Sequence, residues 1–259
     1  MTELLRLAEH AARLAGADLL ARRGRVEGLD TKTSATDPVS DADRASEELL
    51  VRTLLAARPD DGLLGEEGAA RAGTSGLRWV LDPLDGTVNW LYGFPAWCVS
   101  VACEDGREAP GEALVGVVYD PLRDECFRAA RGEGAWLVSP HGERRLRVND
   151  PVPLARALVA TGFGYDVEDR RRQAATVARV LPLARDIRRG GAAALDLCWV
   201  AAGRLDGYYE DTTSRWDWAA AALIAREAGA VVTPYGDATH DGVIAAGPIL
   251  HDALRDVVT

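Results

Sequence analysis

The chain has 259 residues, of which 47% are hydrophobic and 27% charged, and its formal net charge is −10. This composition is typical of a globular protein with one large domain or two closely joined lobes. The acidic balance argues against non-specific nucleic-acid binding, and no apolar run approaches the roughly 20 residues of a membrane-spanning helix.

The four cysteines, Cys98, Cys103, Cys126 and Cys198, have no C-x-x-C spacing and no accompanying histidine cluster. A zinc site is therefore not expected. The N-terminal segment lacks the basic, apolar and small-residue order of a secretory leader. We interpret the chain as a soluble cytoplasmic protein whose reduced cysteines are small buried hydrophobic residues.

The first third of the chain predicts two helices, a loop and a strand. Apolar residues at helical spacing predict a helix over about residues 3–22, followed by a loop at 31–38. Ser40 as N-cap and Asp43 at the third helical position fit a capping box that starts a second helix, which ends before Pro59. Residues 60–75 are interpreted as a glycine-rich loop, and the apolar run 77–81 as a strand.

The middle of the chain predicts an antiparallel sheet with strands at 96–103, 113–119, 125–130 and 135–138. From about residue 155 the pattern changes to βα alternation. Strands are predicted there at 157–161, 186–189, 205–209, 230–233 and 242–246, and helices at 168–180, 192–202, 216–228 and the C-terminal end. We expect one unit over 1–259, with an N-terminal α+β lobe over about 1–150 and a C-terminal α/β lobe over about 151–259.

The most informative motif follows the predicted strand 77–81 and contains Asp82, Asp85, Gly86 and Thr87. Two carboxylates this close repel each other unless a positive charge lies between them. Oxygen ligands on a turn stiffened by Pro83 suit a hard cation such as Mg²⁺, and the backbone N–H groups of Gly86 and Thr87 could receive a phosphate. Taken alone, the same residues also fit an ordinary surface turn.

Four further segments could contribute chemistry. The acids at 37–43 could simply complement a helix dipole, and Glu66 and Glu67 could lie in a solvated loop. Asp217, between two tryptophans, could cap a helix or serve a buried site, because a carboxylate among large rings is costly to bury without a partner. The small residues at 190–194 could admit a ligand or a neighbouring helix.

Together these motifs resemble the inositol monophosphatase family. The resemblance rests on the run 82–87 with Asn89 and Trp90 after it, on 65–67 upstream, and on 195–198, 207–210 and 216–220 downstream. Their order and spacing fit along nearly the whole chain. The family fold is a layered α-β-α-β-α sandwich, of the inositol monophosphatase and fructose-1,6-bisphosphatase type.

The resemblance implies two or three Mg²⁺ ions in the site. Glu66, Asp82 and the carbonyl of Leu84 would hold one ion, and Asp82, Asp85 and Asp217 a second. A third, weaker ion would be bound by Glu66.

The resemblance also implies roles for neighbouring residues. Thr87, paired with Asp43, would orient the attacking water, so the implied catalytic residues are Glu66, Thr87, Asp43 and Asp85. Lys32 would lie near the metals. The implied substrate-binding residues are Asp85, Gly86, Thr87, Ala193, Glu210 and Asp217.

The implied activity is lithium-sensitive, Mg²⁺-dependent hydrolysis of inositol 1-phosphate by a homodimer. Because positioning and electrostatics suffice for phosphoryl transfer, we predict direct attack by metal-bound water. Val88 and Ala192 replace residues that are often Ser or Thr in the family, which leaves the substrate open. The alternatives are histidinol phosphate, fructose 1,6-bisphosphate, adenosine 3′,5′-bisphosphate, and a non-catalytic partner-binding role in transcription; a structural metal site fits poorly.

Overall fold

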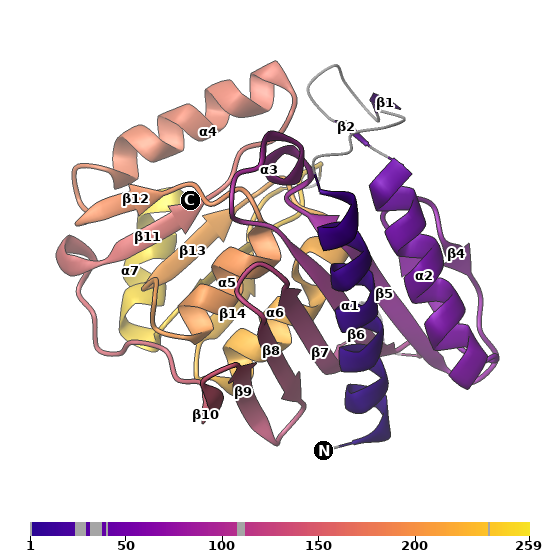
Figure 1. The fold of residues 1–259 in the computed structure, drawn as a ribbon. Coiled ribbons are helices and arrows are strands. Elements are labelled where there is room, and N and C mark those ends of the chain that lie inside the picture. Colours follow the sequence, from indigo (N-terminus) through magenta and orange to yellow (C-terminus); the bar gives the residue numbers. More distant parts are fainter. Residues whose placement is uncertain (1, 24–29, 32–37, 40, 108–111, 238) are drawn as a thin grey trace.

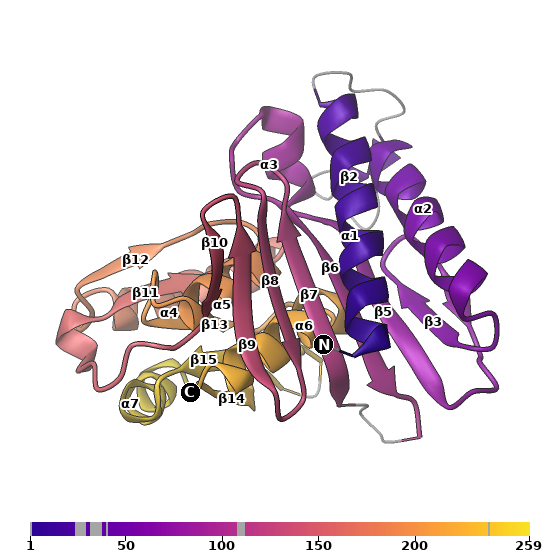
Figure 2. The ribbon, with the colours of Figure 1, turned by 60° about the horizontal axis from the view of Figure 1, so that its bottom comes forward.

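The computed structural model describes residues 2–23, 30–31, 38–39, 41–107, 112–237 and 239–259. In these residues, three layers of helices alternate with two sheets (Figures 1 and 2). This is the expected α-β-α-β-α arrangement. None of the described helices is long and apolar enough to cross a membrane.

The first layer consists of α1 (Glu3–Arg22) and α2 (Asp41–Ala57), which cover one face of an eight-stranded sheet. The strand order is β10-β9-β8-β7-β6-β5-β3-β4, and every neighbouring pair is antiparallel except β3 and β5. The strands are β3 (Gly62–Gly65), β4 (Ala70–Arg71), β5 (Leu77–Asp85), β6 (Cys98–Asp105), β7 (Ala113–Asp120), β8 (Glu125–Ala130), β9 (Gly134–Ser139) and β10 (Gly142–Arg145).

The central helices α5 (Ala193–Ala201) and α6 (Arg215–Glu227) pack between this sheet and a five-stranded one. The second sheet has the order β12-β11-β13-β15-β14, with β11 parallel to β12 and β13 and the other pairs antiparallel. Its strands are β11 (Leu158–Thr161), β12 (Asp186–Arg188), β13 (Gly207–Glu210), β14 (Val231–Pro234) and β15 (Val243–Ala246). The last layer contains α4 (Val167–Val180) and α7 (Pro248–Val258).

Strand periodicity divides the core between the two faces of the large sheet. Because successive side chains of a strand point to opposite faces, Trp79 and Leu81 pack in the cluster under α1 and α2, while Val80 packs in the cluster around α5 and α6. A Cβ at Gly116 of β7 would lie 2.6 Å from the carbonyl oxygen of Ala220, so glycine allows α6 to approach the sheet closely. All four cysteines are free and buried, as expected.

The long elements agree with the sequence, and the differences concern short ones. Residues 60–75 are not a loop throughout, because β3 pairs with β5 and β4 with β3. The predicted strand 77–81 continues to Asp85 as β5, so Asp82 and Asp85 lie in a strand and not in a surface turn. Helix α3 (Thr87–Tyr92), β10 and the 3₁₀ turn Leu154–Arg156 were not predicted. These elements are too short to carry a clear period of their own.

The segment between α1 and α2 is described only in part. Thr31 and Pro38, the ends of the expected loop 31–38, pair in the two-residue strands β1 (Asp30–Thr31) and β2 (Pro38–Val39). Residues 32–37 and the predicted cap Ser40 lie outside the described residues, and so does Lys32.

Candidate active site

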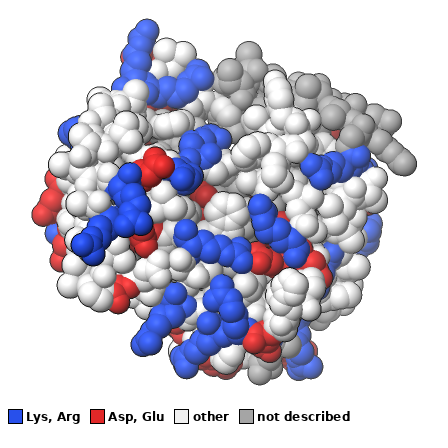
Figure 3. Space-filling model, turned by 60° about the vertical axis from the view of Figure 1, so that its left-hand side comes forward, with Lys and Arg blue, Asp and Glu red and all other residues white. Residues whose placement is uncertain are grey.

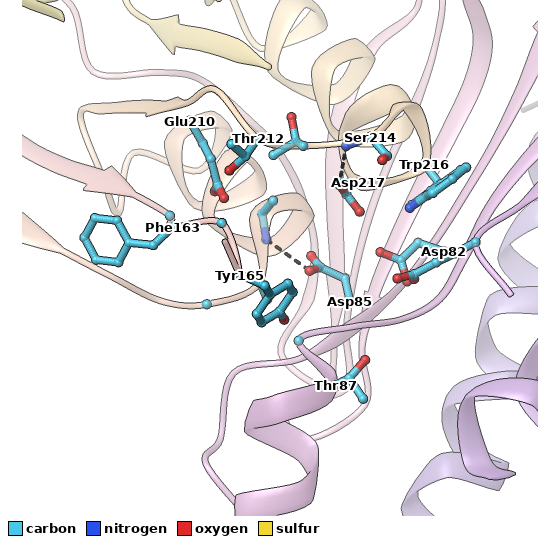
Figure 4. A pocket seen from close by; sticks show the side chains of 18 of the residues that line it. Asp82, Asp85, Thr87, Phe163, Tyr165, Glu210, Thr212, Ser214, Trp216 and Asp217 are labelled. Carbon is cyan, nitrogen blue, oxygen red and sulfur yellow. Dashed lines mark hydrogen bonds between the residues drawn. The ribbon is translucent and has the colours of Figure 1, made fainter. Parts of the chain in front are cut away.

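A cavity of about 710 Å³ lies beside the ends of β5 and β13 and the first turns of α5 and α6. Its lining is rich in carboxylates, which come from segments far apart in the sequence. Figure 4 shows Asp82, Asp85 and Asp217 directed into this space, with Thr87 at its lower edge. The acidic residues lining it include Glu66, Asp82, Asp85, Asp196, Glu210 and Asp217.

A bulge in β5 brings Asp82 and Asp85 to the same face of the sheet. Asp82 is paired with Ser100 of β6, but Asp85 is paired with Cys98, so β5 has one extra residue between them. In a regular strand, residues three apart would point to opposite faces. Pro83 lies in the extra stretch, where its missing N–H costs no ladder hydrogen bond. The bulge therefore directs both carboxylates into the cavity.

Asp85 fixes the beginning of α5. Its carboxylate accepts hydrogen bonds from the backbone N–H groups of Ala193 (3.1 Å) and Ala194 (2.7 Å), which have no partner within the helix. Burial nevertheless raises the pKa of Asp85 to about 7, and the charge of Glu66 contributes. The helix therefore holds the Asp85 side chain in place, while burial and the acidic surroundings destabilise its ionised form.

Asp217 has a similar position in α6. It is the third residue of the helix, and its carboxylate accepts a 2.6 Å hydrogen bond from the N–H of Ser214 in a capping box. Burial raises the pKa of Asp217 well above its usual value, and the charges of Glu66 and Asp85 add to the effect. The capping role is thus present, and the side chain also faces the cavity.

Asp82 has one carboxylate oxygen without a hydrogen-bond donor. Oδ1 accepts a 3.0 Å hydrogen bond from the Leu84 N–H, but Oδ2 is buried without any donor. Burial raises the pKa of Asp82 well above its usual value, followed by the charges of Glu66 and Asp85. A buried anionic oxygen without a donor is costly, and a cation relieves that cost.

This donor set fits a hard divalent cation. The available atoms are carboxylate and carbonyl oxygens, the ligands that Mg²⁺ prefers. Among the described residues, no group of three or more His, Cys, Asp or Glu side chains is arranged to hold an ion as it stands. No N–H group competes for Oδ2 of Asp82, so that oxygen remains available to an incoming ion.

The segment after β3 places Glu66 and Glu67 at the cavity. Its backbone is held by the buried Glu47 of α2, whose two carboxylate oxygens accept hydrogen bonds from the N–H groups of Glu67 and Ala69, each 2.9 Å long. Glu47 also occupies the space that a Cβ at Gly65 would need. This support was not predicted, because it depends on a contact between residues 20 positions apart.

Thr87 begins α3 and lies beside Asp43 of α2. The Thr87 hydroxyl lies 2.9 Å from Oδ1 of Asp43 and 3.1 Å from the carbonyl oxygen of Leu84. All three residues are buried. Gly86 before it has φ 90°, and a Cβ there would lie 2.9 Å from the Ala96 carbonyl oxygen, so the turn requires glycine.

The far end of the cavity is formed by Ala193, Glu210 and residues that were missed in the sequence. Burial raises the pKa of Glu210, while a 2.6 Å hydrogen bond from the Tyr208 hydroxyl and the charge of Arg189 oppose that rise. Arg189 and Phe163 line the same end. Arg189 directly precedes the small-residue segment 190–194, and this position is the only feature of the sequence that could have identified it as a cavity residue.

Comparisons with known proteins agree with this architecture. The profile of the Inositol monophosphatase family matches residues 1–257. Inositol-1-monophosphatase SuhB of Mycobacterium tuberculosis (strain ATCC 25618 / H37Rv) is 44% identical over 266 residues, which cover 96% of this chain and 90% of that protein. Nus factor SuhB of Pasteurella multocida (strain Pm70) is 40% identical over 265 residues, 99% of this chain and 96% of that protein. The crystal structure of extragenic suppressor protein suhB from Bartonella henselae matches with a TM-score of 0.90 and 35% identity, covering 100% of this chain and 99% of the other.

Proposed function

Because the chain belongs to the inositol monophosphatase family, we propose that it is a Mg²⁺-dependent phosphomonoesterase that releases phosphate from inositol 1-phosphate. The observation that carries this proposal is the buried, donor-free Oδ2 of Asp82 among the carboxylates of Glu66, Asp85 and Asp217. A site of this charge repels a phosphate dianion unless cations neutralise it.

In this proposal, the carboxylates of Glu66, Asp82, Asp85 and Asp217 and the carbonyl of Leu84 hold two or three Mg²⁺ ions. When bound, the ions supply charge neutralisation, a lowered pKa of water and stabilisation of the phosphoryl oxygens. The backbone N–H groups of Gly86 and Thr87 receive the phosphate.

Asp43 and Thr87 act on the attacking water. With its own proton directed to Oδ1 of Asp43, the Thr87 oxygen has lone pairs free to accept a hydrogen bond from water. Asp43 thereby fixes the orientation of the Thr87 hydroxyl. At the other end, Ala193 and Glu210 contact the alcohol portion of the substrate.

The test is phosphate release with Mg²⁺ from inositol 1-phosphate, histidinol phosphate, fructose 1,6-bisphosphate, adenosine 3′,5′-bisphosphate and glycerol 2-phosphate. The expected result is the highest kcat/KM for inositol 1-phosphate and inhibition by lithium ions. Preference for another ester would change the proposed substrate but leave the proposed phosphomonoesterase activity intact. No turnover of any ester would contradict the proposal.

A second candidate function is binding to a partner in transcription. It is favoured by relatives named Nus factor SuhB, including the one from Pasteurella multocida. A complementation experiment distinguishes the two functions. Cells that lack this protein are supplied with either the wild type or the Asp82→Asn variant. A phenotype restored by this variant as well as by the wild type would favour the binding role.

The sequence pattern and the family resemblance support further parts of the proposal. We propose that the chain forms a homodimer in the cytoplasm, and that it acts on a small phosphorylated substrate without contacting nucleic acid or a membrane. We also propose that residues 1–150 and 151–259 are the two lobes of a single unit.

A further inference from the structure

Arg189 is a cation in an otherwise acidic cavity. Among the described residues that line the cavity, it is the one with a basic side chain. Figure 3 shows basic and acidic side chains lying side by side on one face of the molecule, and the neighbouring Arg188 is paired in this way with Asp186 at 2.6 Å. Arg189 differs, because no hydrogen bond or ion pair joins its exposed guanidinium to another described residue.

The position of Arg189 is defined by its neighbours. It follows β12, and its Nη1 occupies the space that a Cβ at Gly191 would need, so the side chain folds back over that glycine. Its guanidinium carbon lies 5.9 Å from the centre of the Phe163 ring. Gly191 in turn lies against the Gly86 turn, since a Cβ at Gly86 would be 3.2 Å from the Gly191 carbonyl oxygen. Arg189 is therefore held over Gly191 and beside the Phe163 ring.

Arg189 also faces Glu210. Its charge opposes the rise that burial causes in the pKa of Glu210, and it has the same effect on Asp196. However, no ion pair within 4.0 Å is formed between Arg189 and either acid. In Figure 4, Glu210 and Phe163 lie on the side of the cavity away from Asp82 and Trp216. A donor and an acceptor thus line the same cavity without forming an ion pair with each other.

The chemistry of these two groups selects a ligand. A guanidinium only donates hydrogen bonds, and an ionised carboxylate only accepts them. A hydroxyl does both, so two neighbouring hydroxyls can bridge the pair. A second phosphate would only accept, so it could not bridge the donor and the acceptor, and the carboxylate of Glu210 would repel it. The Phe163 ring adds an apolar surface for the C–H face of a carbon ring.

Building on the phosphatase function proposed above, we propose that Arg189 is a specificity-determining residue that binds, together with Glu210, neighbouring hydroxyls of a cyclic polyol monophosphate. Arg189 contacts the alcohol and not the reacting phosphoryl group. It therefore favours polyol monophosphates over bisphosphates and over phosphate esters whose alcohol portion has no further hydroxyl.

The experiment compares inositol 1-phosphate with cyclohexyl phosphate, which has a six-membered ring without hydroxyls. The variants are Arg189→Ala, Arg189→Lys and the matched control Arg188→Ala. For inositol 1-phosphate, Arg189→Ala is expected to raise KM about 10- to 100-fold with little change in kcat, as for loss of a charge-assisted hydrogen bond. Arg189→Lys should recover part of the loss, and Arg188→Ala should match the wild type. Cyclohexyl phosphate should show no change in any variant.

Calorimetric titration with inositol 1-phosphate separates this proposal from the phosphatase function. If the wild type binds the ester more tightly than Arg189→Ala, the role of Arg189 holds even without turnover. If the wild type hydrolyses the ester and Arg189→Ala has the same KM, Arg189 has no such role and the phosphatase function stands. An equal loss for cyclohexyl phosphate, or a larger loss for fructose 1,6-bisphosphate, would show that Arg189 binds a phosphate and overturn the proposal. If the wild type neither binds nor hydrolyses inositol 1-phosphate, both proposals fail.

Discussion

The Thr87 hydroxyl lies 2.9 Å from Oδ1 of Asp43, which is 44 residues earlier in the chain. The two residues belong to different helices, α3 and α2, and both are buried. A hydroxyl whose proton is fixed by a carboxylate presents its lone pairs in a defined direction. This pair is therefore suited to orient a water molecule beside the Asp82–Asp85 bulge.

Thr87→Val, which keeps the shape and removes the hydroxyl, is expected to lower kcat by about 10²- to 10⁴-fold, the range for loss of a positioned proton acceptor. KM should change little, because the hydroxyl acts on water and not on the ester. Steady-state phosphate release measures both values, and Thr87→Ser should recover much of the activity. Because the two residues act as a unit, adding Asp43→Asn to Thr87→Val should cost little more; full additivity would contradict the coupling.

Asp82→Asn should abolish Mg²⁺ binding at the site that Asp82 shares with Asp85 and Asp217 and lower kcat by about 10³-fold or more, since metal ions supply several kcal/mol of transition-state stabilisation. The same change should stabilise the metal-free protein, because it removes a buried carboxylate without a donor on Oδ2. Calorimetry with Mg²⁺ and thermal unfolding in a chelator measure the two effects. A variant with wild-type Mg²⁺ affinity would rule out Asp82 as a ligand.

The stability of the metal-free protein should fall as the pH rises from about 4 towards 7. Burial raises the pKa of Asp85 to about 7, against about 3.9 in an unfolded chain. Between these values the folded state holds a proton that the unfolded state has lost. The stabilisation is therefore complete below the unfolded pKa and is lost as the pH passes the folded pKa.

Urea unfolding in a chelator at several pH values checks this dependence. Asp85→Asn should show a smaller decrease between pH 4 and 7 than the wild type, whatever its absolute stability without the full α5 cap. Mg²⁺ should restore the stability of the wild type at pH 7. Equal pH slopes in the two proteins would show that Asp85 is not the titrating group.

Glu47→Gln should weaken Mg²⁺ binding without abolishing folding. Glu47 accepts hydrogen bonds from the N–H groups of Glu67 and Ala69, so its loss frees the segment that presents Glu66. The Mg²⁺ concentration for half-maximal activity, and the Mg²⁺ dissociation constant, should rise by about tenfold, the lower range for a residue that orients a metal ligand. Glu48→Gln, at an exposed position in the same helix, is the control and should match the wild type. If both variants bind Mg²⁺ equally well, the segment does not depend on Glu47.

The amino-acid sequence by itself determined the long elements, and its resemblance to a known family implied the layered architecture. The helical periods of α1, α2, α4 and α6 and the alternating or continuous apolar runs of the main strands are local patterns that a chain can show without its tertiary contacts. The sequence also indicated the segments that line the cavity. Asp82 and Asp85 follow an apolar strand and precede a glycine, and Asp217 lies between two tryptophans.

Only the tertiary structure decided how those segments work together. The strands β3 and β4 and the helix α3 are too short to be stable alone and exist because neighbouring strands and helices pair or pack with them. The extra residue that turns Asp82 and Asp85 to one face is visible only against the register of β6. Glu47 and Arg189 belong to no recognisable sequence motif. Glu47 binds N–H groups about 20 residues away, and Arg189 lines a cavity built from distant segments, so neither arrangement can be inferred from the local sequence.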